Sequence, residues 1–272
     1  NNVMNSNIFG VIQNLNKPEI DSDKNLINNP LYNSKNKLNI PNFNNDNSQN
    51  FKNFIFYKNQ PIGSGSFGEV LYGINREKNS EVAIKLVTSE TSDKAISKEI
   101  NFTKTLQTEI GFPHYYDYGD HDNKKIIILS LLGPSLDKLF KYTQKKFTIK
   151  TVCKIGKEII CRLQTMHRKG YIHRDLKPNN LTWGNFSSKY NNNIMSENND
   201  INTIYLIDFG LSGSYKDKYG MHYKSEEGYN FVGTLRYASI NAHKGNRQSR
   251  RDDLESMMYI LIYFLKGKLP WQ

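Results

Sequence analysis

The alternation of apolar and polar residues divides the chain into two regimes. Residues 1–53 are roughly one-third asparagine and show no sustained helical or strand period, which predicts a disordered segment. Beyond it, apolar runs at residues 70–74 and 82–87 flank a polar turn at 75–80, and this pattern predicts two strands joined by a turn. Residues 54–272 are therefore expected to form the folded domain.

Helical patterns follow at about residues 93–107, 148–168 and 253–265, and residues 203–207 are predicted to form a strand. A second asparagine-rich stretch, at about residues 185–202, precedes that strand and is interpreted as a low-complexity insertion in a surface hairpin. No apolar run approaches the roughly 18 residues of a membrane helix. We therefore expect a soluble protein with no membrane partner.

Charge and cysteine content narrow the classes of partner and compartment. The formal net charge of +11 is compatible with nucleic acid, a lipid surface or an acidic protein. No aromatic-plus-basic nucleic-acid signature is found, so no specific nucleic acid is expected, and the basic run at residues 243–251 is interpreted as a solvated face. Cys153 and Cys161 match neither a CxxC pair nor a metal cluster. We interpret them as small core or groove residues in a reducing compartment, which makes the expected localisation cytoplasmic and/or nuclear.

Gly63, Gly65 and Gly68 lie just before the first of these predicted strands. Their spacing alone also fits a dinucleotide-binding turn, but such a turn leads into a helix, whereas here the next two elements are predicted strands. The glycines are therefore expected in a hairpin. Without Cβ atoms, its main chain can fold closely over phosphate oxygens.

Lys85 lies within the apolar strand at residues 82–87. A buried cation is costly unless an acidic partner neutralises it, and that partner is expected on the next predicted helix. The alternative is a lysine that extends its ammonium group to the surface.

Two motifs that can carry phosphoryl transfer follow in order. The sequence HRDLKPNN at residues 173–180 contains Asp175, and Asp208-Phe209-Gly210 begins 33 positions after that aspartate. After a glycine-rich turn and a buried lysine, this order resembles the protein kinases. The resemblance implies a bilobal α+β fold, with a small lobe made of an antiparallel sheet and one helix, and a mainly helical large lobe.

Further segments resemble one family of kinases. Ser239-Ile240-Asn241 stands where most protein kinases have Ala-Pro-Glu, and residues 131–136, 233–241, 248–256 and 270–272 also closely resemble the casein kinase 1 family. The resemblance runs from about residue 54 to residue 272. It implies that the large lobe continues with further helices, which would cover the apolar residues of the last predicted helix.

The resemblance assigns roles to individual residues. Asp175 would act as base and orienter of the attacking hydroxyl, Lys177 would steady the γ-phosphate of ATP, and Asn180 and Asp208 would hold Mg²⁺. Lys85 would contact the α and β phosphates. Glu99, on the predicted helix at residues 93–107, would fix Lys85, and Glu109, past the expected end of that helix, is the alternative partner. The expected cover over the nucleotide consists of Gly63, Ser64, Gly65, Ser66, Phe67, Gly68 and Val70. The expected adenine slot consists of Ile62, Val70, Ala83 and Leu132, with Leu129 controlling the pocket behind it and the main chain of Leu131 and Leu132 holding the purine edge.

The resemblance also implies supporting roles and a substrate class. Asp253 would brace the catalytic loop by hydrogen bonds, and His173 would orient it. Lys177, two residues after Asp175, is typical of serine/threonine kinases, so protein substrates with aliphatic hydroxyls and acidic surroundings are expected, for an enzyme that acts as a monomer.

Departures from the family leave two questions open. Lysines that hold an anion in the family are replaced by Gly213 and Tyr229, so a requirement for phosphate-primed sites stays open. A pseudokinase or scaffold that binds nucleotide without catalysis is the alternative function. The presence of Lys85, Asp175 and Asp208 favours catalysis. The resemblance to casein kinase 1 implies that the activation segment at residues 208–241 is ordered without a phosphate of its own.

Overall fold

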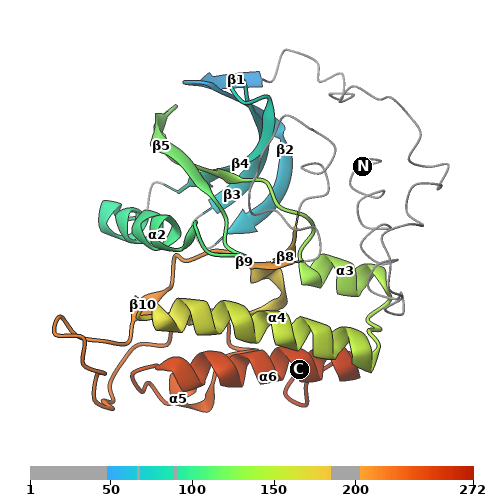
Figure 1. Cartoon of the computed structure of the whole chain (residues 1–272), viewed down its shortest axis with the longest axis vertical. Helices are drawn as coiled ribbons and strands as arrows, with labels where there is room; N and C mark the ends of the chain where they lie inside the picture. Colours follow the sequence, from blue (N-terminus) through green and yellow to red (C-terminus); the bar gives the residue numbers. More distant parts are fainter. Residues whose placement is uncertain (1–47, 66–67, 89–90, 185–202) are drawn as a thin grey trace.

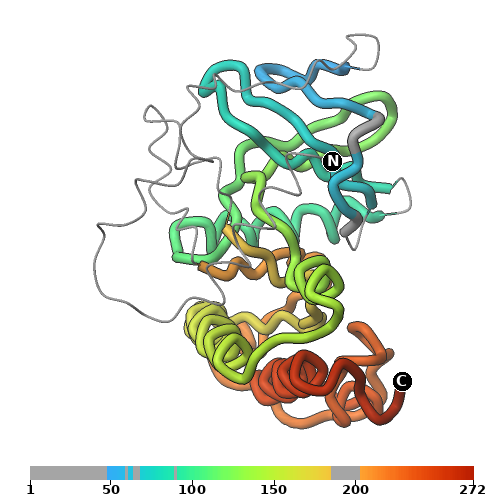
Figure 2. Tube along the Cα trace, turned by 90° about the vertical axis from the view of Figure 1, so that its right-hand side faces the viewer, coloured from blue at the N-terminus to red at the C-terminus, as the bar shows by residue number. Residues whose placement is uncertain are grey.

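The computed structural model describes residues 48–65, 68–88, 91–184 and 203–272, which form two lobes (Figure 1). The segment up to residue 47 and the expected insertion at 185–202 lie outside the described residues. Figure 2 shows the sheet lobe above and the helical lobe below. The architecture is therefore the bilobal α+β fold expected from the sequence.

The small lobe is a curled antiparallel sheet with one helix beside it (Figure 1). Its strands follow the order β1-β2-β3-β4-β6-β5, and α2 (Asp93–Leu106) follows β4 in the chain. The strands are β1 (Ser48–Phe51), β2 (Phe54–Gly65), β3 (Gly68–Asn75), β4 (Ser80–Val87), β5 (Tyr115–His121) and β6 (Lys124–Ser130). Alternate residues of the central strands, such as Leu71, Ile84 and Ile128, are fully buried inside the curl, because successive side chains of a strand point to opposite faces.

Strand β1 corrects the expected domain boundary. Residues 48–53 were expected to belong to the disordered segment, but Ser48–Phe51 pairs with β2 from Ser48↔Tyr57 to Phe51↔Phe54. Four residues are too few to show a period, and their order comes from distant contacts. The Phe51 ring lies where a Cβ on Gly119 of β5 would be 2.5 Å from it. The folded domain therefore begins before residue 54.

The large lobe is built on two long helices that lie side by side, α4 (Ile149–Arg168) and α6 (Arg250–Lys266) (Figures 1 and 2). The shorter elements are α3 (Leu136–Tyr142), β7 (Tyr171–Ile172), the 3-10 turn η3 (Pro178–Asn180), β8 (Leu181–Trp183), β9 (Ile204–Leu206), β10 (Gly213–Ser214) and α5 (Ile240–His243). Strand β8 pairs with β9 and β7 with β10, both antiparallel. The expected insertion thus connects the two strands of a hairpin.

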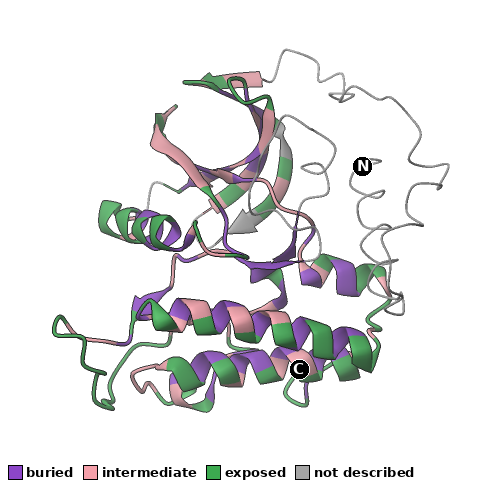
Figure 3. Ribbon diagram, in the orientation of Figure 1, coloured by how far each residue is buried: buried purple, intermediate pink, exposed green. Residues whose placement is uncertain are grey.

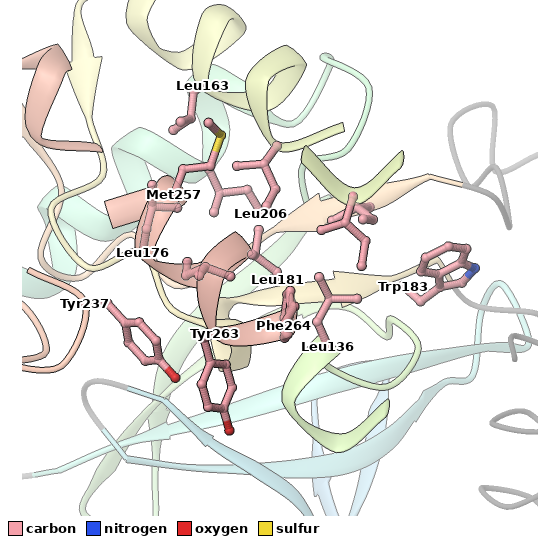
Figure 4. Packing of buried hydrophobic residues seen from close by; sticks show 14 of the residues in the cluster. Leu136, Leu163, Leu176, Leu181, Trp183, Leu206, Tyr237, Met257, Tyr263 and Phe264 are labelled. Carbon is pink, nitrogen blue, oxygen red and sulfur yellow. The ribbon is translucent and has the colours of Figure 1, made fainter. Parts of the chain in front are cut away.

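Helix boundaries follow from their caps. α6 begins three residues before the expected start, because the Ser249 main-chain N–H donates to the Asp252 carboxylate at 2.6 Å, as in a capping box. It ends at Gly267, whose φ of 76° is left-handed. Between the helices and the β8–β9 hairpin lies one apolar core, of which Figure 4 shows Leu181, Leu206 and Phe264.

Both long helices are buried on one face and exposed on the other (Figure 3). The two cysteines are free; Cys153 is exposed and Cys161 is partly buried. The interpretation of Cys153 as a core or groove residue was therefore wrong, because α4 turns that position to its outer face. No helix among the residues that the structure describes is long and apolar enough to cross a membrane.

Candidate active site

The glycine-rich stretch forms the hairpin expected from the sequence. Strands β2 and β3 pair in antiparallel fashion, with Gly63 opposite Val70 and Gly65 opposite Gly68. Gly68 has a φ of 152°, and a Cβ there would lie 2.0 Å from the Leu86 carbonyl oxygen. Only glycine fits this close approach. Nothing lies within 4 Å of a Cβ built on Gly63, so this part of the hairpin has open space beside it.

Lys85 on β4 is the centre of a buried charge cluster. Its side chain is 4% exposed, and its Nζ donates to Glu99 Oε1 at 2.5 Å and to Asp208 Oδ1 at 3.0 Å. Burial alone would lower the pKa of Lys85, but the two carboxylates raise it above its ordinary value, so the ammonium group stays charged. The predicted pair with Glu99 is confirmed, and Glu109 instead pairs with Lys169 at 2.8 Å.

Asp175, in the loop before η3, is the third carboxylate of the site and is held in place by neighbouring side chains. Thr234 donates from its hydroxyl to Asp175 Oδ1 at 2.6 Å, and Lys177 Nζ donates to Asp175 Oδ2 at 2.7 Å. Asn180 donates from Nδ2 to the main-chain oxygen of Asp175 at 2.9 Å. Asp175 is 5% exposed. A carboxylate held in this way can accept a proton from a hydroxyl that enters the site.

Asp253, near the start of α6, braces this loop. Its Oδ2 accepts the main-chain N–H of His173 and its Oδ1 that of Arg174, both at 2.9 Å, which confirms the hydrogen bonds expected from the sequence. His167 Nε2 lies 2.8 Å from the same Oδ2, a partner that sequence reasoning did not assign. Arg174 has a left-handed φ of 67°, a conformation that is costly outside glycine and needs such support.

The residues expected to form an adenine slot lie on neighbouring strands and at the junction of the lobes. Tyr72 pairs with Ala83, and Ala83 with Leu129, which places Ala83 between β3 and β6. The main chain on either side of Leu131 and Leu132 is fixed, because Ser130 N–H donates to His114 and Gly133 N–H to Trp183. The half-buried members of the slot are Ile62, Val70, Ala83, Leu129, Leu131 and Leu132.

Two parts of the expected nucleotide cover stay untested. Ser66 and Phe67 lie outside the described residues, and Ser64 and Gly65 are described only by their place in β2.

One contact at the adenine slot was not predicted from the sequence. Lys138 Nζ, from α3, donates to the Ile62 carbonyl on β2 at 2.9 Å. It joins the two lobes, and no local pattern could have indicated it, because the residues are 76 positions apart.

The family model of the protein kinase domain matches residues 56–272, most of the chain. The chain belongs to the protein kinase family. It is thus an ATP-dependent enzyme that acts on protein substrates and uses a divalent metal ion, as this family does.

The activation segment of the kinase is held by residues that lie before and after it in the chain. Arg174 Nε donates to the Leu211 carbonyl at 2.6 Å, and Nη2 to the Ser212 carbonyl at 3.3 Å. Gly213 leaves room for this guanidinium, since a Cβ there would lie 3.2 Å from its Cζ. Further along, the Arg247 guanidinium lies 4.2 Å from the ring centroid of Tyr223. These contacts order the segment through the chain itself.

Ser239-Ile240-Asn241 makes hydrogen bonds to α6 that its resemblance to casein kinase 1 did not predict. Ser239 Oγ donates to Asp252 Oδ1 at 2.7 Å, and Asn241 Nδ2 lies 3.3 Å from the same oxygen. The Ile240 main-chain N–H donates to Glu255 at 2.9 Å. The end of the activation segment is therefore fixed to the first turns of α6, the helix that also carries Asp253.

Proposed function

We propose that this protein kinase phosphorylates serine and threonine side chains in acidic regions of proteins, as a member of the casein kinase 1 type. The observation that carries the proposal is the pair of hydrogen bonds on Asp175, from Lys177 and Thr234. A cation beside the catalytic carboxylate is suited to steady the transferring phosphate near a short alcohol. The resemblance of residues 233–241 and 248–256 to casein kinase 1 supports the subfamily.

The chain's donor set fits Mg²⁺ and ATP. Lys85 is paired with two carboxylates, Glu99 and Asp208, and the Asp208 carboxylate supplies oxygen atoms of the kind that a divalent cation would use. Asn180 donates through Nδ2, which leaves its carbonyl oxygen as the atom that can ligate a metal. Oxygen ligands of this kind suit Mg²⁺. Bound there, the ion would neutralise charge on the ATP phosphates.

The remaining residues of the chain supply position and charge. Lys85 is aimed by Glu99 so that its ammonium group can meet phosphate oxygens, and the Gly63–Gly68 hairpin main chain can cover them. Asp175 orients the substrate hydroxyl and accepts its proton, and Lys177 steadies the γ-phosphate. Catalysis by these groups is mainly orientation and electrostatic stabilisation.

The acidic preference rests on exposed basic residues around the activation segment. Residues 218–231 are exposed throughout, and Lys218, Lys224 and Arg236 lie in or near this stretch. Arg174 is not assigned to the substrate, because it already donates to the main chain of residues 211–212. We therefore do not assign it a role in recognising phosphate-primed sites.

Phosphate transfer from radiolabelled Mg-ATP to an acidic protein tests the proposal. The wild type should label serine and threonine but not tyrosine. Asp208→Ala should abolish transfer, and Asp175→Asn should lower kcat at least about a hundredfold with little change in ATP affinity. Asp93→Asn, at a side chain that is 76% exposed, is the matched control and should keep normal turnover.

The alternative, a pseudokinase, makes the opposite prediction. It would bind the nucleotide without labelling any protein, and Asp175→Asn would change nothing that the assay measures. Labelling of tyrosine, or undiminished turnover in either catalytic variant, would also refute the proposed assignment.

A further inference from the structure

Helix α2 packs against the cores of both lobes. Ile96 and Ile100 pack with Val87 and Ile127 in the small lobe, whereas Phe102 and Leu106, near its C-terminal end, join the core of the large lobe. Glu99, the partner of Lys85, lies between Ile96 and Ile100 on this helix and about one turn before Phe102. The position of its carboxylate therefore depends on how the C-terminal end of α2 is held.

The connection from α2 to β5 is tied to the large lobe through its main chain. The Gly111 carbonyl accepts the main-chain N–H of Leu206 in β9 at 2.9 Å, two residues before Asp208. The preceding carbonyl, of Ile110, accepts Nη1 of Arg162 from α4. Phe112 is buried in the large-lobe core. The connection is therefore fixed by two elements of that lobe.

Arg162 is buried at this contact and has further partners there. It is 7% exposed, and its Nη2 donates to Glu158 Oε2 at 2.9 Å. A buried guanidinium needs such partners, because an unpaired buried charge is strongly destabilising. Gly111 lies directly against it, since a Cβ there would be 2.5 Å from Nη1, and its φ of +81° also favours glycine. The site admits a guanidinium only because residue 111 has no side chain.

We propose that Arg162 is a positioning residue of the kinase: by holding the Ile110 carbonyl, it fixes the C-terminal end of α2 and so keeps Glu99 directed at Lys85. The effect is indirect, because Arg162 touches neither Lys85 nor Glu99 in any contact that the structure records. The activity measurement for this positioning role rests on the proposed function, whereas the anchoring of α2 by Arg162 does not.

A double-mutant cycle on the chain tests this role. Arg162→Met should lower kcat/KM for ATP about tenfold, while the same change in a Glu99→Gln background should lower it less than about twofold, because the group being positioned is already impaired. Arg162→Lys, which keeps the positive charge and one donating nitrogen, should recover part of the lost kcat/KM. Lys169→Met is the matched control: it removes the partly exposed ion pair between Lys169, directly after α4, and Glu109 in this connection, and should leave kcat/KM within about twofold of wild type.

Hydrogen exchange provides a readout that does not require phosphoryl transfer. Amides of residues 99–112 should exchange faster in Arg162→Met than in Lys169→Met. If Arg162→Met fails to fold, Gly111→Ala, which pushes against the guanidinium, should give the same pattern. Equal losses in both backgrounds, or faster exchange confined to α4, would overturn the positioning role. A wild type that labels no protein but shows the exchange pattern would refute the proposed function alone.

Discussion

Asp253→Asn tests whether the catalytic loop is held by a carboxylate on α6. The side chain of Asp253 is 2% exposed, and its two oxygens accept different main-chain N–H groups, those of His173 and Arg174. An asparagine keeps the shape but has one oxygen and one NH₂ group. Whichever way the amide turns, one main-chain N–H then faces a donor instead of an acceptor.

The expected cost can be worked out from these contacts. A hydrogen bond to a charged acceptor contributes about 1.5–3 kcal/mol, and a buried donor left without a partner costs about 1–3 kcal/mol. Arg174, with its left-handed φ of 67°, also loses part of its support. We expect the free energy of unfolding to fall by about 3 kcal/mol, which corresponds to a fall in Tm on the order of 10 °C for a domain of this size.

Denaturant unfolding and steady-state kinetics measure the outcome. Turnover should fall more than ATP affinity, because the displaced loop carries Asp175 and not the Lys85 cluster. Asp217→Asn is the matched control: one oxygen of Asp217 also accepts two main-chain N–H groups, from Tyr219 and Met221 at 2.9 Å, but in an exposed turn. It should cost less than about 1 kcal/mol. If Asp253→Asn were as stable and as active as this control, the reasoning would be wrong.

Three further predictions concern the nucleotide site and its control. Because Arg174 donates to main-chain carbonyls, protein made in bacteria and treated with phosphatase should keep its turnover, and a tenfold loss in a labelling assay would contradict this. Lys138→Met removes the hydrogen bond to Ile62 between the lobes and should speed release of a fluorescent ATP analogue a few-fold in stopped-flow measurements; an unchanged rate would show that the contact does not restrain the slot. Gly68→Ala places a Cβ 2.0 Å from a carbonyl oxygen of the neighbouring strand, and the resulting shift of the hairpin should weaken ATP binding by roughly tenfold in calorimetry, whereas unaltered affinity would refute the need for glycine.

Some contacts could be predicted from the sequence, because a local pattern required a partner or because the surrounding residues resemble a known family. Lys85 lies in an apolar strand, and a cation there requires an acidic partner. The resemblance to the kinases then named Glu99, and the structure places its carboxylate 2.5 Å from Lys85 Nζ. Asp253 was named by resemblance of its surrounding sequence. The second carboxylate on Lys85, that of Asp208, was not foreseen as its partner, since 123 positions separate the two residues.

Other features left no local signal. Strand β1 is too short for a period, and it is ordered by pairing with β2 and by the packing of Phe51 on Gly119. Cys153 follows the helical pattern of α4, but the pattern did not reveal that this position faces outward. No local pattern distinguishes Arg162 from the other cations of α4, because its burial against Gly111 depends on how the two lobes meet.

The sequence by itself determined the types of the main elements, the hairpin of the glycines and the set of groups available for phosphoryl transfer, because these depend on period, backbone freedom and chemistry within short stretches. The tertiary structure alone decided which of these groups meet. Asp175 is held by Thr234, 59 positions away, and Lys85 by Asp208. Such contacts form only when packing within the large lobe, or between the two lobes, brings distant segments together, since the energy that orders them comes from burial shared by the whole core.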